Sequence, residues 1–294
     1  MASIKSPLYT DASLNRALVL ATLGIGLLCV TDAMVKWVAP LYSVIQIAFL
    51  RYLFGTAGAL VIVAKSRPGR LSRETVHTNM VRALLVTATT LTFFYALSTL
   101  PFAETVAISF LSPLFIVLMG KLVLKEAIHR FTLVAIALGV VGTAVILGNK
   151  IGTEQYHEHA LLGALAAIAS ALFYASNMIF LRARATRDSM ASIVFFQNFG
   201  PTLILLLPVL YFWTPPSQAD LLLFVALGLV GVLSHLLLSL AYSAAEAGKL
   251  AFVEYTALLW AALFGFLIFG EKLDNSIWIG AALIVAGALI TARK

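Results

Sequence analysis

The chain carries the same plan twice, and this internal repeat limits its fold more than any other feature of the sequence. Residues 101–147 hold two long apolar runs on either side of a short charged turn, and residues 248–292 return to that arrangement. One constant shift, the separation of Glu126 and Glu271, aligns the two segments without a gap. The aligned pairs include Gly120 with Gly265 and Gly142 with Gly287. Self-similarity at half the chain length predicts a duplicated fold.

The apolar runs are too many and too long for a soluble core. The chain is 61% hydrophobic and 11% charged, whereas soluble proteins average about 25% charged residues. A helix that crosses a bilayer needs about 20 apolar residues, and ten segments meet this requirement. We therefore predict an all-α integral membrane protein of ten transmembrane helices. They cover about residues 17–38, 42–64, 80–99, 102–124, 131–147, 160–181, 191–213, 221–244, 250–269 and 277–292, with surface loops over 65–78 and 149–159.

Five helices in each half is an odd number, so the second half enters the membrane in the opposite orientation. We predict a first repeat over 14–148, an external loop over 149–159 and a second repeat over 160–292. Most of the 20 lysines and arginines fall in segments that share a side with the N-terminus, which places both termini in the cytoplasm. The exceptions are Lys36, Lys150, Lys272 and Arg51. Inverted repeats are typical of transporters that hold substrate near the membrane midplane.

Several motifs resemble the EamA-type drug/metabolite transporter superfamily. Besides the ten helices in two repeats, they are Ser112-Pro113 and the turns Leu124-Lys125-Glu126 and Phe269-Gly270-Glu271. Within the superfamily the chain looks most like the YddG group of bacterial inner-membrane exporters, and this resemblance implies export of aromatic and other neutral amino acids. The second half departs from the pattern because Leu258 stands where Pro113 would repeat. We therefore expect no kink in the helix over 250–269.

Three polar stripes mark helix faces that point inward. Polar side chains inside a membrane helix are costly and usually face a cavity or a partner helix, and positions i, i+4 and i+7 share one face. The stripes are Thr105, Ser109 and Ser112; Ser170, Tyr174 and Asn177; and His235, Ser239 and Tyr242. The repeat shift sets Ser109 onto Glu254. We predict that these faces converge on a water-filled cavity; the alternative is hydrogen bonding between helices, which contributes about 0.6 kcal/mol per contact.

An amino-acid substrate needs anchors for its ammonium and its carboxylate, and room for its side chain. Glu254 is predicted to bind the ammonium, while His235, Asn177 and the hydroxyls hold the carboxylate. Aromatic rings offer surfaces for apolar side chains. The predicted substrate-binding residues are Tyr95, Ser109, Tyr174, Asn177, His235, Ser239, Tyr242, Glu254 and Trp260. Glu254 and His235 are also the candidates for proton coupling.

Two other charged positions need an explanation. Asp32 and Lys36 are spaced i, i+4 near the outer end of the first helix, and a surface ion pair is the simpler interpretation, with a gate as the alternative. Arg51 lies about 13 Å into the second helix. It either extends outward to the membrane surface or pairs with a buried carboxylate.

The leading interpretation is a secondary-active or facilitative transporter that exports amino acids by alternating access. The alternative is an exporter of drugs or other small metabolites. An intramembrane enzyme is remote, because the sequence lacks G-x-S-x-G and D-D-x-x-D motifs, and a scaffold would not need inward polar stripes. The sequence also lacks a G-x-x-x-x-G-K-[ST] loop and metal-ligand spacings. We therefore expect no enzyme activity, cofactor or metal, and expect a small-molecule substrate and the lipid bilayer, not nucleic acid, as partners.

Overall fold

The structure of the chain is a computed structural model. It describes residues 11–66, 72–100, 102–109, 111–125, 130–148, 160–184, 187–245, 247–250, 253–254 and 256–269, and eight residues between 278 and 290. The predicted external loop over 149–159, the turn residues Glu126 and Glu271 and half of the helix predicted over 277–292 lie outside the described residues.

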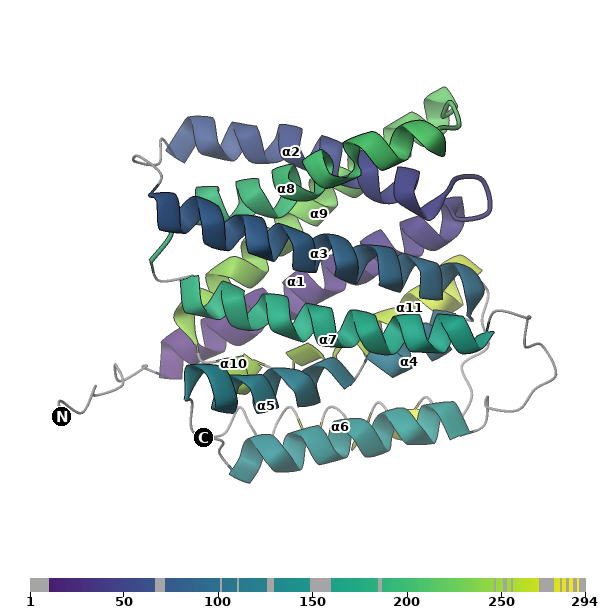
Figure 1. Cartoon of the computed structure of the whole chain (residues 1–294). Coiled ribbons are helices and arrows are strands. Elements are labelled where there is room, and N and C mark those ends of the chain that lie inside the picture. Colours follow the sequence, from purple (N-terminus) through teal and green to yellow (C-terminus); the bar gives the residue numbers. More distant parts are fainter. Residues whose placement is uncertain are drawn as a thin grey trace.

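All regular structure in the described ranges is helical (Figure 1). Six helices are long and apolar enough to cross a membrane: α1 (Asp11–Val38), α2 (Val44–Ser66), α3 (Arg73–Thr99), α7 (Ala160–Arg184), α8 (Met190–Tyr211) and α9 (Gln218–Ala244). The shorter helices are α4 (Phe102–Ser109), α5 (Leu111–Leu124), α6 (Arg130–Gly148), α10 (Ala247–Leu250) and α11 (Thr256–Phe269). The predicted all-α membrane fold is confirmed.

The third helix begins earlier than predicted. Ser72 caps α3, because its hydroxyl accepts a hydrogen bond from the backbone N–H of Thr75 at 3.0 Å. Such a cap satisfies one of the free N–H groups at a helix start. The expected surface loop over 65–78 is therefore too long, and residues 73–78 form the first turns of α3. The apolar pattern missed these turns because they are polar.

The fourth predicted helix is described as two segments, α4 and α5, on either side of residue 110, which lies outside the described residues, and α5 contains Pro113. Proline has no N–H, so the carbonyl four residues earlier, that of Ser109, loses its helical partner. The hydroxyl of Ser112 donates a hydrogen bond to this carbonyl instead. A side chain therefore satisfies the freed backbone group, as a proline inside a membrane helix requires.

The expectation of an unbroken helix over 250–269 is wrong. Residues 253–254 are in a 3₁₀ turn between α10 (Ala247–Leu250) and α11 (Thr256–Phe269), and residues 251–252 and 255 lie outside the described residues. The hydroxyl of Thr256 donates to the carbonyl of Val253 at 2.7 Å, as Ser112 does in the first half. The break needs no proline, because a side-chain donor can satisfy the interrupted backbone. In the described residues the second half thus contains a helix interrupted by a 3₁₀ turn, and Glu254, the residue aligned with Ser109, lies in that turn.

The packing of the helices is two-fold symmetric. Helix α1 packs against α9 and α11, and its repeat mate α7 packs in the same way against α3 and the α4–α5 pair. Helices α2 and α8, which occupy equivalent places in the two halves, pack against each other, and so do α4 and α11. The two repeats therefore interlock and do not lie side by side as separate bundles (Figure 1). A cavity on the symmetry axis is then lined by both repeats.

The bundle has two ends of different chemistry. At the end where α3 begins and α7 ends, here called the basic end, Asp188 accepts hydrogen bonds from Arg184 (3.0 and 2.8 Å), Thr75 (2.9 Å) and Asn79 (3.1 Å). Burial raises the pKa of Asp188, but these hydrogen bonds outweigh that effect and hold its pKa below the usual range. At the opposite end, Tyr42 donates to Asp220 at 2.8 Å and joins the α1–α2 connection to α9.

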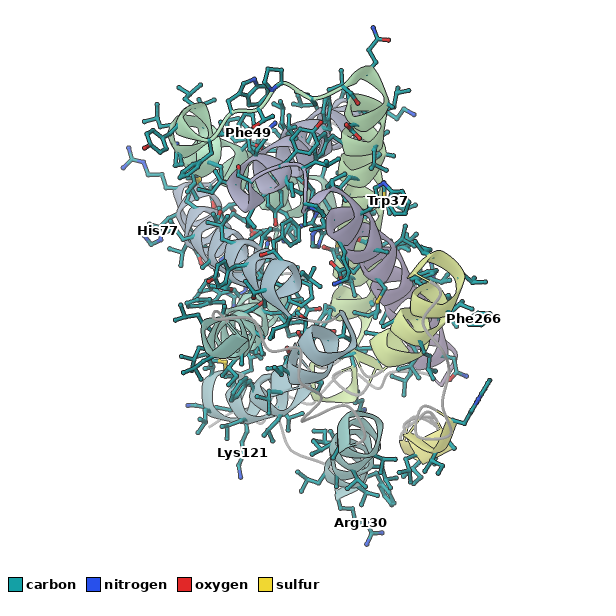
Figure 2. All side chains as sticks on the ribbon, turned by 90° about the vertical axis from the view of Figure 1, so that its right-hand side faces the viewer. Trp37, Phe49, His77, Lys121, Arg130 and Phe266 are labelled. Atoms are coloured by element: carbon teal, nitrogen blue, oxygen red, sulfur yellow. The ribbon has the colours of Figure 1, made fainter. Side chains whose placement is uncertain are left out.

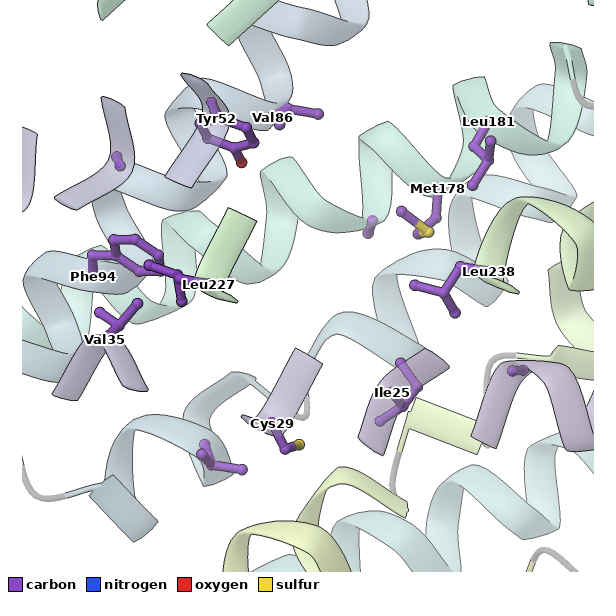
Figure 3. Close-up of a cluster of buried hydrophobic side chains, with 14 of the residues drawn as sticks. Ile25, Cys29, Val35, Tyr52, Val86, Phe94, Met178, Leu181, Leu227 and Leu238 are labelled. Carbon is purple, nitrogen blue, oxygen red and sulfur yellow. The ribbon is translucent and has the colours of Figure 1, made fainter. Parts of the chain in front are cut away.

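Apolar side chains cover the outside of the bundle and fill its inside. Figure 2, viewed from the opposite end, shows Trp37 and Phe266 on the outer surface, where they are 60% and 52% exposed. Such a surface suits lipid and not water. The interior cluster in Figure 3 includes Ile25, Tyr52 and Phe94, each at most 3% exposed. This cluster fixes the helices that carry the cavity walls.

Candidate functional site

A cavity of about 150 Å³ lies in the middle of the bundle and is lined by both repeats. A buried water needs roughly 10–15 Å³ of such space, so the cavity can hold several waters or part of a small ligand. Its walls combine apolar surface with charged and polar side chains, as ligand sites do. The charged and strongly polar lining residues are Asp32, Arg51, Ser109, Tyr174, Asn177, Gln197, His235 and Glu254.

Five of the nine predicted substrate-binding residues line this cavity, and they come from three different helices and a break. They are Ser109, Tyr174, Asn177, His235 and Glu254. Ser112 and Ser170, which belong to the same two stripes, also line it, whereas Thr105 is buried and is not among the lining residues. The stripes on the fourth and sixth predicted helices therefore face a common space. Their roles toward a substrate remain predictions.

The other four predicted residues are not among those that line the cavity. Ser239 and Tyr242 are buried in α9, at 2% and 1% exposure, so only His235 of that stripe reaches the cavity. Tyr95 is half-buried near the end of α3. Trp260 fills the space beside Gly26 and stacks on Phe264 with ring centroids 6.0 Å apart. A helical repeat predicts which positions share a face, but helix crossing decides how far along that face the cavity extends.

Glu254 is held in place by Tyr174. The tyrosine hydroxyl on α7 donates a hydrogen bond to Oε1 of Glu254 at 2.9 Å, across the interface between the two sides of the cavity. Glu254 is 9% exposed and sits in the 3₁₀ turn between α10 and α11. A break of this kind frees backbone groups and carries a side chain into the cavity, which is how discontinuous helices form transporter sites.

Two charged residues that were assigned to other roles also line the cavity. Asp32 lies one helical turn after Cys29 on the cavity face of α1 and is not confined to the surface. Arg51 is 6% exposed, so it does not extend outward to the membrane surface. The mid-helix charge was a usable signal for Arg51. For Asp32, the i, i+3 spacing from Cys29 pointed to this face, but the nearby Lys36 offered a simpler explanation.

Glycines bring α2 and α9 close enough to place Arg51. A Cβ atom on Gly228 would lie 2.7 Å from the backbone N of Gly55 and 2.8 Å from the carbonyl oxygen of Arg51. No side chain fits there, so the two helices touch through their backbones. This contact seats Arg51 against α9 and turns its side chain toward the cavity.

The basic end of the cavity is closed by a second buried arginine. Arg82 on α3 donates hydrogen bonds to Asn177 (3.2 Å), Asn79 (3.0 Å) and Gln197 (2.7 Å). The sequence-based count placed Arg82 among the cytoplasmic charges, but it is 2% exposed and links α3, α7 and α8. Asn79 also donates to Asp188. It therefore links the hydrogen bonds of Arg82 to those of Asp188 at the basic end.

The single cysteine of the chain gives a direct test of the cavity. Cys29 lines it and donates a weak hydrogen bond to the carbonyl of Ala257 at 3.6 Å. We expect a small water-soluble methanethiosulfonate reagent to label Cys29 in membranes, and the variant Cys29→Ser to remain unlabelled. Water-filled access explains such labelling, since Cys29 is otherwise 4% exposed. Labelling only after denaturation would contradict a cavity that opens to water.

Comparison with known proteins gives one consistent result. The sequence pattern of the EamA-like transporter family matches twice, at residues 15–148 and 161–293. The pseudopaline exporter CntI of Pseudomonas aeruginosa is 27% identical over 95% of this chain and 97% of its own length. The S-adenosylmethionine uptake transporter of Rickettsia prowazekii is 26% identical over 88% of this chain and 86% of its own. An uncharacterized transporter of Helicobacter pylori is 29% identical over 94% and 93%.

A solved crystal structure has the same fold. It superimposes with a TM-score of 0.76 over 96% of each chain, at 21% sequence identity. At this identity the likeness concerns the fold, and it supports the two-repeat architecture described above.

Proposed function

The chain belongs to the EamA-like transporter family, and from this premise we propose that it carries a small polar metabolite across the membrane through the cavity between its repeats. Its two halves would move against each other so that the cavity opens first to one side and then to the other. The single observation that carries this proposal is the cavity itself, which is lined by Asp32, Arg51 and Glu254. Charged residues within membrane helices are costly and usually serve a substrate or ion path.

Small metabolites form a broader substrate class than the amino acids favoured by the sequence. The relatives are named for pseudopaline and S-adenosylmethionine, and these names support a metabolite transporter better than a dedicated amino-acid exporter. They also name opposite directions, export and uptake, so likeness does not set the direction here. Free amino acids, and the narrower resemblance to the YddG group, remain one candidate within this class.

We further propose that the basic end faces the cytoplasm. Lys65, Arg73, Lys121 and Arg187 lie at this end, whereas the opposite end of the described chain carries Lys36, and positive charges favour the inner side. The proposed location is a bacterial inner membrane with both termini inside. Energy would come from the substrate gradient or from proton antiport, and we propose Glu254 and His235, which line the cavity together with Asp32, as the groups that would carry the proton.

The test is a pair of leucine substitutions on one helix. Leu28 lines the cavity, whereas Leu23 is 49% exposed on the outer surface of α1. In proteoliposomes we expect saturable uptake of radiolabelled S-adenosylmethionine or methionine that is stimulated by unlabelled substrate inside. Leu28→Trp should reduce this uptake at least tenfold because the indole fills the cavity, while Leu23→Trp should leave it close to wild type. Equal uptake in the two variants would place the transport path elsewhere.

A further inference from the structure

Two buried side-chain nitrogens in the cavity wall have no partner in the described structure. They are Nε of Arg51, on α2, and Nε2 of His235, on α9. Buried polar groups are nearly always hydrogen-bonded, and one that is not requires an explanation. Both side chains are more than nine-tenths buried. A polar ligand that enters the cavity would supply the missing acceptor and explain both.

Arg51 also has no carboxylate within ion-pair distance in the part of the chain that the structure describes. Its Nη1 donates to the hydroxyl of Tyr52 at 3.2 Å, and the guanidinium lies 5.0 Å from the ring centre of Tyr52 and 5.9 Å from that of Phe94. A buried charge is costly unless it is paired, and the aromatic rings replace only part of the lost hydration.

Arg82, the second buried arginine, has the hydrogen bonds expected of an arginine with a structural role. Each nitrogen of the Arg82 guanidinium donates to an amide oxygen, on Asn79, Asn177 or Gln197. Arg51 donates one side-chain hydrogen bond, to the hydroxyl of Tyr52, although it is buried almost as deeply. Both arginines are buried in the same helical bundle, so the difference in their hydrogen bonds indicates that Arg51 has a partner that is bound only part of the time.

The two unpartnered nitrogens lie along the same stretch of α9. A Cβ atom on Gly231 would lie 3.4 Å from Nε of Arg51 and 3.6 Å from its Nη2, so the guanidinium contacts α9 at Gly231. His235 follows Gly231 by one helical turn and lies on the same face. An oxyanion between Arg51 and His235 could accept hydrogen bonds from both. Carboxylates are well suited, because the planar guanidinium can bind both of their oxygens.

The remaining charges of the cavity favour a cation. Asp32 lines the cavity from α1 and Glu254 from the break before α11. The hydrogen bond from Cys29 to Ala257 holds these two elements together near both acids. Two carboxylates would repel a doubly charged phosphate but attract an ammonium or another cation. The cavity therefore offers a basic wall and an acidic wall to one molecule.

We propose that the transported molecule is a zwitterion whose carboxylate binds Arg51 and His235 and whose cationic group binds Asp32 and Glu254. The proposal rests on the proposed function, since it names the substrate class of the same cavity. The best fit is a molecule with an α-amino acid head group. Arg51 is the residue that selects for the carboxylate, and this selection separates such substrates from lipophilic cations that have no anionic group.

The first test needs no ligand. Arg51→Met removes an unpaired buried charge, whereas Arg82→Met leaves three amide oxygens without a donor. In detergent or nanodiscs we expect Arg51→Met to melt at the same temperature as wild type or higher, and Arg82→Met to melt lower. A loss of stability in Arg51→Met equal to that in Arg82→Met would make Arg51 a structural residue and overturn the proposal.

The second test uses matched probes with and without the carboxylate. The pairs are methionine with methioninamide, and S-adenosylmethionine with its decarboxylated form, each measured by the slowing of Cys29 labelling. A hydrogen bond to a charged group contributes enough binding free energy to change the affinity at least tenfold. We therefore expect the carboxylate form of each pair to bind wild type at least tenfold more tightly than the form without it. In Arg51→Gln this ratio should fall to about one.

The outcomes separate the proposal from the proposed function. Ethidium is a cation that has no carboxylate. If it is transported, and Arg51→Gln does not change this transport, the proposed transport function stands and the proposal of a zwitterionic substrate is overturned. An acid-to-amide ratio that stays above ten in Arg51→Gln would overturn it as well. If none of the four probes slows labelling or is transported, the proposed metabolite class fails for them, and the stability comparison of the two arginines still decides the role of Arg51.

Discussion

Replacing Asp188 with alanine is expected to destabilise the protein by about 3–5 kcal/mol, the cost of removing one partner from a buried ion pair. The Asp188 side chain is 2% exposed and accepts two hydrogen bonds from Arg184, whose side chain is 8% exposed. It also accepts from Thr75 and Asn79. The alanine variant leaves these donors buried without an acceptor, and the joint between α3 and the α7–α8 connection is lost. Unfolding in mixed detergent, followed by circular dichroism, measures the change.

The matched control is Glu74→Ala, which removes the other acidic partner of the same arginine. Glu74 is 69% exposed where it meets Arg184, and surface ion pairs contribute only about 0–1 kcal/mol. We expect this variant to stay within about 1 kcal/mol of wild type. If both variants lose the same stability, burial is not what gives the Asp188 pair its strength, and the basic end is not held in the way described.

The variant Glu254→Gln is expected to reduce uptake at low substrate concentration by about 10- to 100-fold. A hydrogen bond to a charged group contributes about 1.5–3 kcal/mol, which corresponds to that range. Glutamine keeps the size of the side chain, and its oxygen can still accept the hydrogen bond from Tyr174. The fold should therefore survive, and the loss reports the missing negative charge. Proteoliposome uptake with and without an imposed pH gradient measures it, and a gradient response lost in the variant assigns proton coupling to Glu254.

Tyr174→Phe provides the comparison, since it removes the hydrogen bond but leaves the charge of Glu254. A neutral donor contributes less than a charged partner, so we expect a loss of less than about tenfold. Wild-type uptake in Glu254→Gln would mean that Glu254 does not touch the substrate. A larger loss in Tyr174→Phe than in Glu254→Gln would assign the main role to the tyrosine hydroxyl.

Some of the cavity could be predicted residue by residue, and some could not. Ser109, Tyr174 and Asn177 were found because helical periodicity places them on inward faces of two helices. Asp32 was assigned to a surface ion pair, because a single helix offers Lys36 as a nearby partner and shows nothing of the opposite wall. Trp260 was expected at the substrate but packs against Gly26. The position of a large ring depends on which small residue faces it, and that residue lies on another helix.

The sequence by itself determined the architecture, because the long apolar runs and their repetition leave a bilayer and a duplicated helical bundle as the solution. Local chemistry explains the early start of α3 through the cap at Ser72, although the apolar pattern alone did not predict it. Only the tertiary structure decided which polar residues share one space and which are already paired. Arg51 and Arg82 both lie within membrane helices, yet every guanidinium nitrogen of Arg82 has a hydrogen-bond acceptor and Nε of Arg51 has none. The acceptors come from other helices, and which helices are close enough depends on crossings such as the one at Gly228. Those crossings depend on contacts between distant parts of the chain.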